Sequence, residues 1–299
     1  MSAGLGKRLH PFTDKAPKPL LPVLGIPIIE YALYWALESG TNEVVINYHH
    51  HKEQMLKYLK SKQVDKRILS SSEENLLLGS AGGIRKSMTK TSGERFIVLN
   101  SDNIFSPNLS RLTQLHQEGM LKDNRRMTLI LKKNYSNKHN YREILVDHKT
   151  GLVLSAGELS SEGYFYTGVC IFEKAAFEHL MVGVNADFLK DVLTTLIKQK
   201  KVGFVLEEEP WLDIGTPELW YEAHFELLKN KNFKFSNEIN RKFKDLGVSS
   251  KPLSMGFFED KQVIEDLSDV NGQIYYGSRE KYKKISKSIT FLESTLNFF

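Results

Sequence analysis

The sequence has one cysteine, no long hydrophobic run and no internal repeat. The single Cys170 excludes a disulfide framework within the chain, which is typical of a reducing compartment. Its apolar neighbours predict a buried thiol rather than a nucleophile. No apolar stretch approaches the roughly 20 residues that cross a bilayer, so no membrane partner is expected. The opening residues also lack the apolar run of a secretory signal, and we expect a cytoplasmic protein.

Charge of one sign is not in large excess either. The 299 residues carry a net charge of +5, and their hydrophobic and charged shares are ordinary for a globular protein. A sequence pI near 9.0 leaves nucleic acid open as a partner. A site for polyanionic phosphates and a basic stretch at 227–245 explain the excess more simply. That stretch is interpreted as a solvated face, and no nucleic-acid partner is expected.

The periodicity of apolar residues predicts an α/β protein. Helical spacing at 28–39 and 51–62 flanks a β-branched strand at 43–48. A nearly all-apolar run at 96–100 is typical of a central parallel strand covered on both faces. The strands that follow have few helices between them and indicate a mixed or antiparallel extension. They are expected at 127–132, 143–146, 151–155 and 164–172, before helices at 174–181 and 188–200, a strand at 202–206 and a helix at 218–229.

Two segments near the start combine glycine, proline and basic residues. Gly4 and Gly6 allow positive φ and present N–H groups to phosphate oxygens, beside Lys7 and Arg8. A glycine pair alone is weak evidence, because it also marks ordinary turns. Five prolines from position 11 to position 27 stiffen the backbone around Lys18 and exclude an ordinary helix or central strand. A rigid connector with an incidental lysine is the simpler alternative.

The composite Ala3-Gly4-Leu5-Gly6-Lys7-Arg8-Leu9 with Pro17-Lys18-Pro19-Leu20 resembles the signature of the sugar-1-phosphate nucleotidylyltransferases. The resemblance continues in the family's order at 78–83 (LGSAGG), 98–102 (VLNSD), 166–169 (YTGV) and 211–217 (WLDIGTP). Within the family, the chain looks like the short mannose-1-phosphate guanylyltransferase and N-acetylmuramate-1-phosphate uridylyltransferase branch. The implied fold is a Rossmann-like mixed, mostly parallel sheet with helices on both faces, of the nucleotide-diphospho-sugar transferase type. The implied catalytic domain covers 1–230, and 231–299 forms a C-terminal extension of unknown role.

The resemblance also implies a role for each matching residue in the transfer of a nucleotidyl group from an NTP to a sugar 1-phosphate. Arg8 would contact the leaving pyrophosphate, and Lys18 would neutralise the α-phosphate and the sugar phosphate. Asp102 and Asp213 would ligate Mg²⁺. The nucleotide would be bound by Ala3, Gly4, Gly6, Lys7, Gly79, Ala81 and Gly82, and the sugar by Gly83, Thr167 and Gly168.

Physical chemistry fits these residue types. Attack of one phosphate on another needs charge neutralisation and positioning more than acid–base work. Mg²⁺ prefers one or two carboxylates together with substrate oxygens and water. The alternative for Asp213 is a capping residue, because Thr216-Pro217 is a good helix start.

Three features depart from the family pattern. Only Met1 and Ser2 precede Ala3, so the family's first hydrophobic strand is missing, and we expect a start upstream of Met1 or else a truncated, less stable form. Ser101 replaces the glycine that most members carry before the metal aspartate. The Glu-Lys-Pro motif for sugar hydroxyls is not found, which leaves the sugar open. A catalytically impaired NDP-sugar-binding regulatory protein of the same fold is therefore the second hypothesis.

The run His49-His50-His51 invites a metal interpretation. Consecutive histidines point in different directions, and no cysteine or second histidine cluster at ligand spacing accompanies them. The run is predicted to be a strand-to-helix turn.

Overall fold

A computed structural model describes residues 1–229 apart from 24–25, 63–64, 73–76, 135–140 and 160–162. The predicted C-terminal extension and nearly all of the basic stretch lie outside the described residues. No helix within the described part is both long and apolar enough to cross a bilayer.

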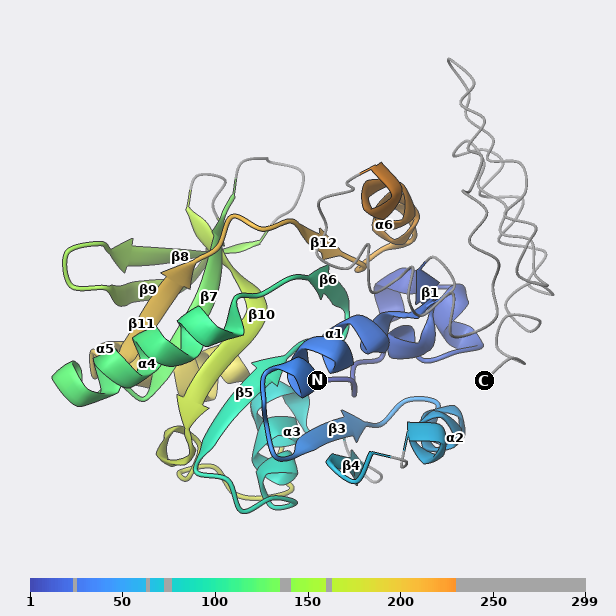
Figure 1. Cartoon of the computed structure of the whole chain (residues 1–299), viewed down its shortest axis with the longest axis horizontal. Coiled ribbons are helices and arrows are strands. Elements are labelled where there is room, and N and C mark those ends of the chain that lie inside the picture. Colours follow the sequence, from blue (N-terminus) through green and yellow to red (C-terminus); the bar gives the residue numbers. More distant parts are fainter. Residues whose placement is uncertain (24–25, 63–64, 73–76, 135–140, 160–162, 230–299) are drawn as a thin grey trace.

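Helices and strands alternate in the first half of the chain, and strands dominate the second (Figure 1). The first half contains β1 (Pro22–Val23), β2 (Ile26–Pro27), α1 (Ile28–Glu38), β3 (Val44–Tyr48), α2 (Lys52–Lys62), β4 (Ile68–Ser72), α3 (Gly79–Met88), β5 (Arg95–Leu99), β6 (Asn103–Phe105) and α4 (Leu109–Asp123). The second contains β7 (Met127–Lys133), β8 (Arg142–Asp147), β9 (Leu152–Leu159), β10 (Tyr164–Glu173), α5 (Thr194–Lys198), β11 (Val202–Leu206), β12 (Trp211–Asp213) and α6 (Pro217–Lys229).

Most of the predicted elements are confirmed, and two helices differ. The helix expected at 174–181 is wrong, because only a 3₁₀ turn at Lys174–Ala176 forms. The chain turns there so that fully buried Phe177 packs on Phe172, with ring centroids 4.4 Å apart. The helix expected at 188–200 begins with a π-helical turn at Phe188–Leu193 before it continues as α5.

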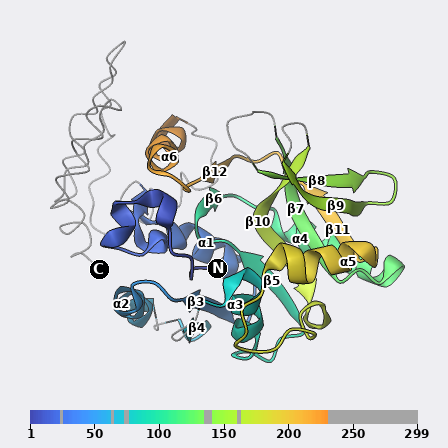
Figure 2. The same ribbon diagram turned by 180° about the vertical axis from the view of Figure 1, so that it is seen from behind.

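The main sheet has the strand order β5-β10-β7-β11-β9-β8. Helix α4 packs on one face, and α5 lies on the other (Figures 1 and 2). These layers confirm the α/β class. Within the described strands, however, parallel pairing is limited to β7 with β11 and to the separate pair β3–β4. The expectation that β5 is a central parallel strand is wrong here, because β5 pairs antiparallel with β10.

A cavity of about 530 Å³ lies between β3 and β5. Its walls come from the two strands and from α1 and α3, including Leu33, Ile46, Ile84, Met88, Phe96 and Val98. The cavity therefore has the place of a strand between two others, with apolar helices beside it.

The first two residues lie at one end of this cavity. The amino group of Met1 donates to Leu99 O at 2.7 Å, and Ser101 N donates to Met1 O at 3.2 Å. That alternation is the pattern of a parallel ladder. Ser2 N donates to Asn47 Oδ1 at 2.8 Å, so Met1 and Ser2 bridge β3 and β5. Ser101, which departs from the family pattern, also donates its hydroxyl to Met1 O at 2.8 Å.

An added strand is expected to stabilise the protein. Five apolar, β-branched residues placed ahead of Met1 match the length of β5 and would fill the cavity while pairing with both flanking strands. Because burial of several apolar side chains is worth a few kcal/mol, we expect the melting temperature to rise by roughly 5 °C or more. A Gly/Ser extension of equal length is the control. Equal melting temperatures for the two extensions, measured by calorimetry, would show that the cavity does not accept a strand.

Candidate active site

The glycine loop is shaped by the packing of Gly6. Its φ of +62° is the left-handed region that favours glycine, and a Cβ there would lie 2.7 Å from Thr13 Cγ2 and 3.3 Å from Lys18 Cβ. The loop and the proline-rich segment are therefore in contact. At exposed Gly4 a Cβ would have no heavy atom of the described residues within 4 Å. Packing does not require glycine at position 4, so its surroundings are open for a ligand.

Basic side chains leave this loop toward solvent. Residues Lys7–Leu9 form a 3₁₀ turn in which Leu9 is fully buried and Lys7 and Arg8 are exposed. Leu9 belongs to an apolar cluster with Phe12, Ile104 and Ile214. Ile104 is part of β6, and Ile214 is the residue after β12. The loop is thus packed against the two strands that border the predicted metal aspartates.

Lys18 makes the central ion pair of the site. Its Nζ lies 2.9 Å from Asp102 Oδ2, and its side chain is only 9 % exposed, against 43 % for Asp102. The backbone around Lys18 is a 3₁₀ turn, Lys18–Leu20, which begins after extended Pro17. A buried ammonium paired with a carboxylate is not an incidental surface lysine, which favours a role in the site over the connector alternative.

The pairing of β6 with β12 brings the two aspartates together. Asp213 lies opposite Asn103, the residue after Asp102, and Ile214 N donates to Asp102 O at 3.3 Å. Among the described residues no group of three or more histidine, cysteine or acidic side chains is suited to a metal. Two neighbouring carboxylates fit a hard cation such as Mg²⁺, which takes its other ligands from water and substrate oxygens.

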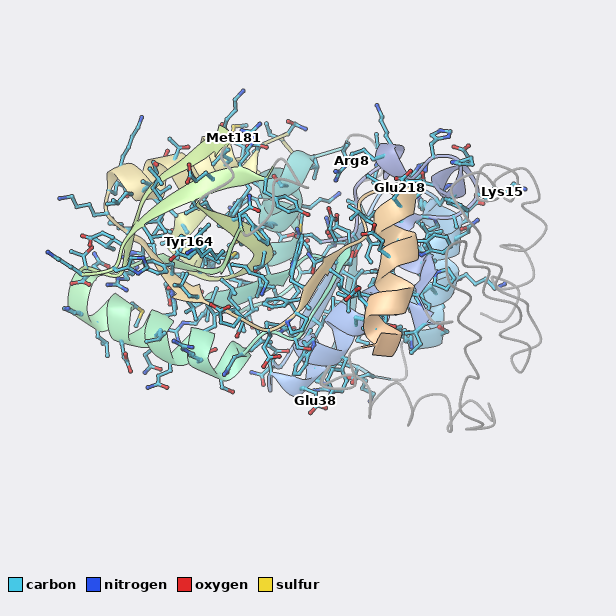
Figure 3. All side chains as sticks on the ribbon, turned by 90° about the horizontal axis from the view of Figure 1, so that it is seen from above. Arg8, Lys15, Glu38, Tyr164, Met181 and Glu218 are labelled. Carbon is cyan, nitrogen blue, oxygen red and sulfur yellow. The ribbon has the colours of Figure 1, made fainter. Side chains whose placement is uncertain are left out.

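Asp213 does not cap the helix that follows it. Leu219 N donates to Thr216 Oγ1 at 3.3 Å, so Thr216 provides the cap of α6. A Cβ on Gly215 would lie 3.0 Å from Arg8 Nη2 and 2.9 Å from Asp213 Oδ1. Arg8 therefore reaches the same space as the Asp213 carboxylate, near Glu218 at the start of α6 (Figure 3).

Tyr141 is a site residue that the sequence did not reveal. Its hydroxyl donates to Asp213 Oδ2 at 3.0 Å. Its ring stacks on Phe165 at 4.7 Å and meets Trp211 edge-on at 5.5 Å. Burial, reinforced by the neighbouring carboxylate of Asp213, raises the pKa of Tyr141 well above its usual value. The phenol thus stays protonated and acts as a donor. No motif marks this tyrosine, which precedes β8 and reaches Asp213 only through the fold.

Thr167 and Gly168 lie next to the aspartates but are turned inward. Thr167 is fully buried, and its hydroxyl donates to Ile130 O at 2.9 Å. Its carbonyl accepts from Asn103 Nδ2 and from Trp211 Nε1. Gly168 has φ +87° at an irregularity of β10, where a Cβ would lie 2.7 Å from Asn100 Nδ2. The Thr167 hydroxyl is therefore engaged in the sheet, and the contact of Thr167 and Gly168 with sugar stays a prediction.

Glycine-rich α3 packs on a distant part of the chain. The N–H groups of Ala81 and Gly82 donate to Ala186 O at 3.0 and 3.2 Å. A Cβ on Gly79, whose φ is +70°, would lie 2.6 Å from the same oxygen. Gly83 is buried in the helix. Packing accounts for small residues here, and no contact described for them reaches the Lys18–Asp102 pair. Their binding of base, ribose or sugar stays a prediction.

The cysteine and the histidine run have the structures that the sequence predicted. Cys170 is fully buried, and burial raises the pKa of its thiol to about 12, so it is not a reactive nucleophile. The three histidines connect the end of β3 at Tyr48 to the start of α2 at Lys52, which confirms the predicted turn.

Comparisons with known proteins place these features in a family. The family model described as "Nucleotidyl transferase" matches residues 1–230. The chain is 27 % identical over 226 residues to a D-glycero-alpha-D-manno-heptose 1-phosphate guanylyltransferase of Aneurinibacillus thermoaerophilus, covering 75 % of this chain and 95 % of that one. It is also 27 % identical over 300 residues to a UTP–glucose-1-phosphate uridylyltransferase of Synechocystis, covering 93 % and 72 %.

Among solved structures, the fold resembles that of HddC from Yersinia pseudotuberculosis, crystallised with GMP-PN. The TM-score is 0.63 at 20 % identity, over 75 % of this chain and 96 % of that chain. The family match spans the glycine loop, the Lys18–Asp102 pair and Asp213 together. The chain belongs to the nucleotidyl transferase family.

Proposed function

We propose that this protein transfers a nucleotidyl group from an NTP to a sugar 1-phosphate, forming an NDP-sugar and pyrophosphate with Mg²⁺. The observation that carries the proposal is the ion pair of buried Lys18 with Asp102, joined to Asp213 by the β6–β12 pairing and to the basic glycine loop by the packing of Gly6 on Lys18. Relatives named as sugar-1-phosphate guanylyl- and uridylyltransferases support the same substrate class. Residues 1–230, the extent of the family match, form the catalytic unit, and 231–299 a separate extension. The single buried thiol supports a cytoplasmic location.

The reaction requires charge to be neutralised on both sides of the transferred phosphorus. An oxygen of the sugar phosphate attacks the α-phosphorus, a new P–O bond forms, and the bond to the β-phosphate oxygen breaks as pyrophosphate leaves. Lys18, close to Gly6, neutralises the α-phosphate and the attacking phosphate. Exposed Arg8 contacts the leaving group, and the loop N–H groups after Gly4 bind its oxygens. No general base is needed, because the nucleophile is already an anion.

Asp102 and Asp213 would hold the metal, and Tyr141 orients the second of them. When bound, Mg²⁺ supplies positive charge to the phosphate oxygens. The Asp102 carboxylate is paired with Lys18 in this structure. Phosphate groups that draw the ammonium toward themselves would release this carboxylate for the cation, so substrate and metal are expected to bind cooperatively.

The second hypothesis, an impaired NDP-sugar-binding regulatory protein, is not favoured. A binder without turnover has no need for a buried lysine paired with one of two adjacent carboxylates. Under either hypothesis the protein would bind nucleotide, but only an enzyme would release pyrophosphate in a metal-dependent way.

Release of pyrophosphate tests the function directly. The four NTPs and dTTP are each combined with a panel of hexose, heptose, N-acetylhexosamine and N-acetylmuramate 1-phosphates, with and without Mg²⁺. We expect turnover with one base and one sugar class, abolished by EDTA. Tight nucleotide binding without pyrophosphate release under any pairing would instead support the regulatory hypothesis.

Substitution Asp102→Asn is expected to remove the metal site while preserving the fold. The rate of pyrophosphate release should fall by about 100-fold or more, because charge stabilisation at the reacting phosphate is lost. Mn²⁺ titration followed by electron paramagnetic resonance should show weaker binding. Asp123→Asn, at the remote end of α4, is the control. Normal turnover and normal Mn²⁺ binding in the Asp102 variant would show that the metal assignment is wrong.

Tyr141→Phe removes one hydroxyl while keeping the aromatic packing. Hydrogen bonds to charged groups are worth about 1.5–3 kcal/mol, so we expect kcat/KM to fall by about tenfold or more. Mn²⁺ affinity should fall as well, because Asp213 loses its orienting donor. Tyr164→Phe, whose hydroxyl lies 3.4 Å from His148 Nε2, is the matched control. Unchanged metal affinity would leave Tyr141 with a packing role only.

A further inference from the structure

The histidine turn makes specific contacts with the segment that follows the glycine loop. His50 Nε2 and His51 Nε2 lie 3.1 and 2.9 Å from the same atom, the carbonyl oxygen of Thr13. One turn further along α2, Gln54 Nε2 donates to Lys15 O at 2.7 Å. Three side chains of one turn therefore bind two carbonyls of the segment 13–15.

Because both histidines approach a carbonyl oxygen, the position of an N–H on each ring can be assigned. A carbonyl oxygen can only accept hydrogen bonds, and its two lone pairs accommodate two donors. Each histidine must therefore carry a proton on Nε2. The two rings are tilted by 59° to each other with centroids 4.1 Å apart, and His51 has φ +48°. Positive φ is uncommon for a residue with a side chain, and here it directs the ring toward Thr13.

Thr13, which the two histidines contact, is itself in contact with the glycine loop. Its hydroxyl donates to Gly6 O at 3.0 Å, and its methyl group lies 2.7 Å from the position that a Cβ of Gly6 would take. Gly6 in turn packs on the Cβ of Lys18. Thr13 thus links the two histidines to Gly6, and Lys18 is reached through Gly6.

We propose that His50 and His51 are positioning residues that clamp the phosphate-binding loop through the Thr13 carbonyl. The inference rests on the proposed function for the meaning of the loop, but its contacts are independent of the identity of base and sugar. The clamp holds the N–H groups after Gly4 in the orientation that binds the triphosphate. Loss of the clamp leaves Lys18 paired with Asp102 and the metal carboxylates in place, so it weakens NTP binding more than the chemical step.

The test compares side chains that can and cannot donate. In the double variant His50→Leu/His51→Leu, both donors are lost, and two neutral hydrogen bonds correspond to about a tenfold change. We expect KM for the NTP to rise about tenfold, with kcat changed by less than about threefold. The double variant His50→Gln/His51→Gln keeps an amide donor on each side chain and should restore KM to within about threefold of wild type.

Two controls separate positioning from general stability. His179→Leu removes a ring contact of the same kind, at 2.8 Å from Asp191 O, away from the loop. Thr13→Val keeps the methyl group beside Gly6 and removes only the hydroxyl, so it should raise KM for the NTP in the same direction as the Leu/Leu variant. Melting temperatures of all variants are measured alongside.

The outcomes distinguish the clamp from the enzyme function. Wild-type protein that binds and turns over no nucleotide overturns the proposed function. An active wild type with unchanged KM in the Leu/Leu variant overturns the clamp, and so does a rise in KM that the Gln/Gln variant does not reverse. A Leu/Leu variant that fails to fold leaves Thr13→Val to decide, and an unchanged KM there also overturns the clamp.

Discussion

Antiparallel pairing of β6 with β12 sets Asp213 opposite Asn103, the residue after Asp102. Both carboxylates act electrostatically on the phenol of Tyr141, and like charges that approach one another repel most strongly where solvent is partly excluded. The structure offsets this repulsion with groups from distant parts of the chain: the ammonium of Lys18, the phenol of Tyr141 and the nearby guanidinium of Arg8. A cation between the carboxylates would offset it further. The loop, the proline-rich segment and the residues before β8 all meet at this pair of charges.

The loop that supplies these cations has little regular structure of its own. Residues 3–20 contain only 3₁₀ turns, so their backbone lacks the ladder bonds of a sheet. Their position depends instead on buried side chains such as Leu9 and Phe12, on proline stiffness, and on donors from the start of α2. Phosphate-binding N–H groups must remain unpaired in the free protein, which explains why the loop is held from outside.

Local patterns predicted the elements well because each carries its own period or terminator, such as the β-branched run of β3 or the helix start at Pro217. The candidate site residues Arg8, Lys18, Asp102 and Asp213 were proposed because they stand in motifs whose order is distinctive, and their roles stay predictions. Strand direction was not predictable for β5, since an all-apolar run suits a parallel or an antiparallel neighbour equally. The hydrogen bonds of Tyr141 to Asp213 and of His50 and His51 to Thr13 could not be predicted, because they join segments that are far apart in the sequence. A match to a motif also does not reveal which way a side chain points. Thr167 stands in such a motif, but its hydroxyl donates to Ile130 O within the sheet.

The cavity between β3 and β5 is connected to the same chemistry. Met1 and Ser2, which end it, lead directly into Ala3 and Gly4, and both bind Ser101, the residue before Asp102. A strand entering through the cavity would fix the start of the glycine loop and the end of β5 at once. In the proposed site, their relative position would set the distance between the loop N–H groups and the Asp102 carboxylate. Filling the cavity would therefore act on the geometry of the site as well as on stability, since one set of hydrogen bonds serves both.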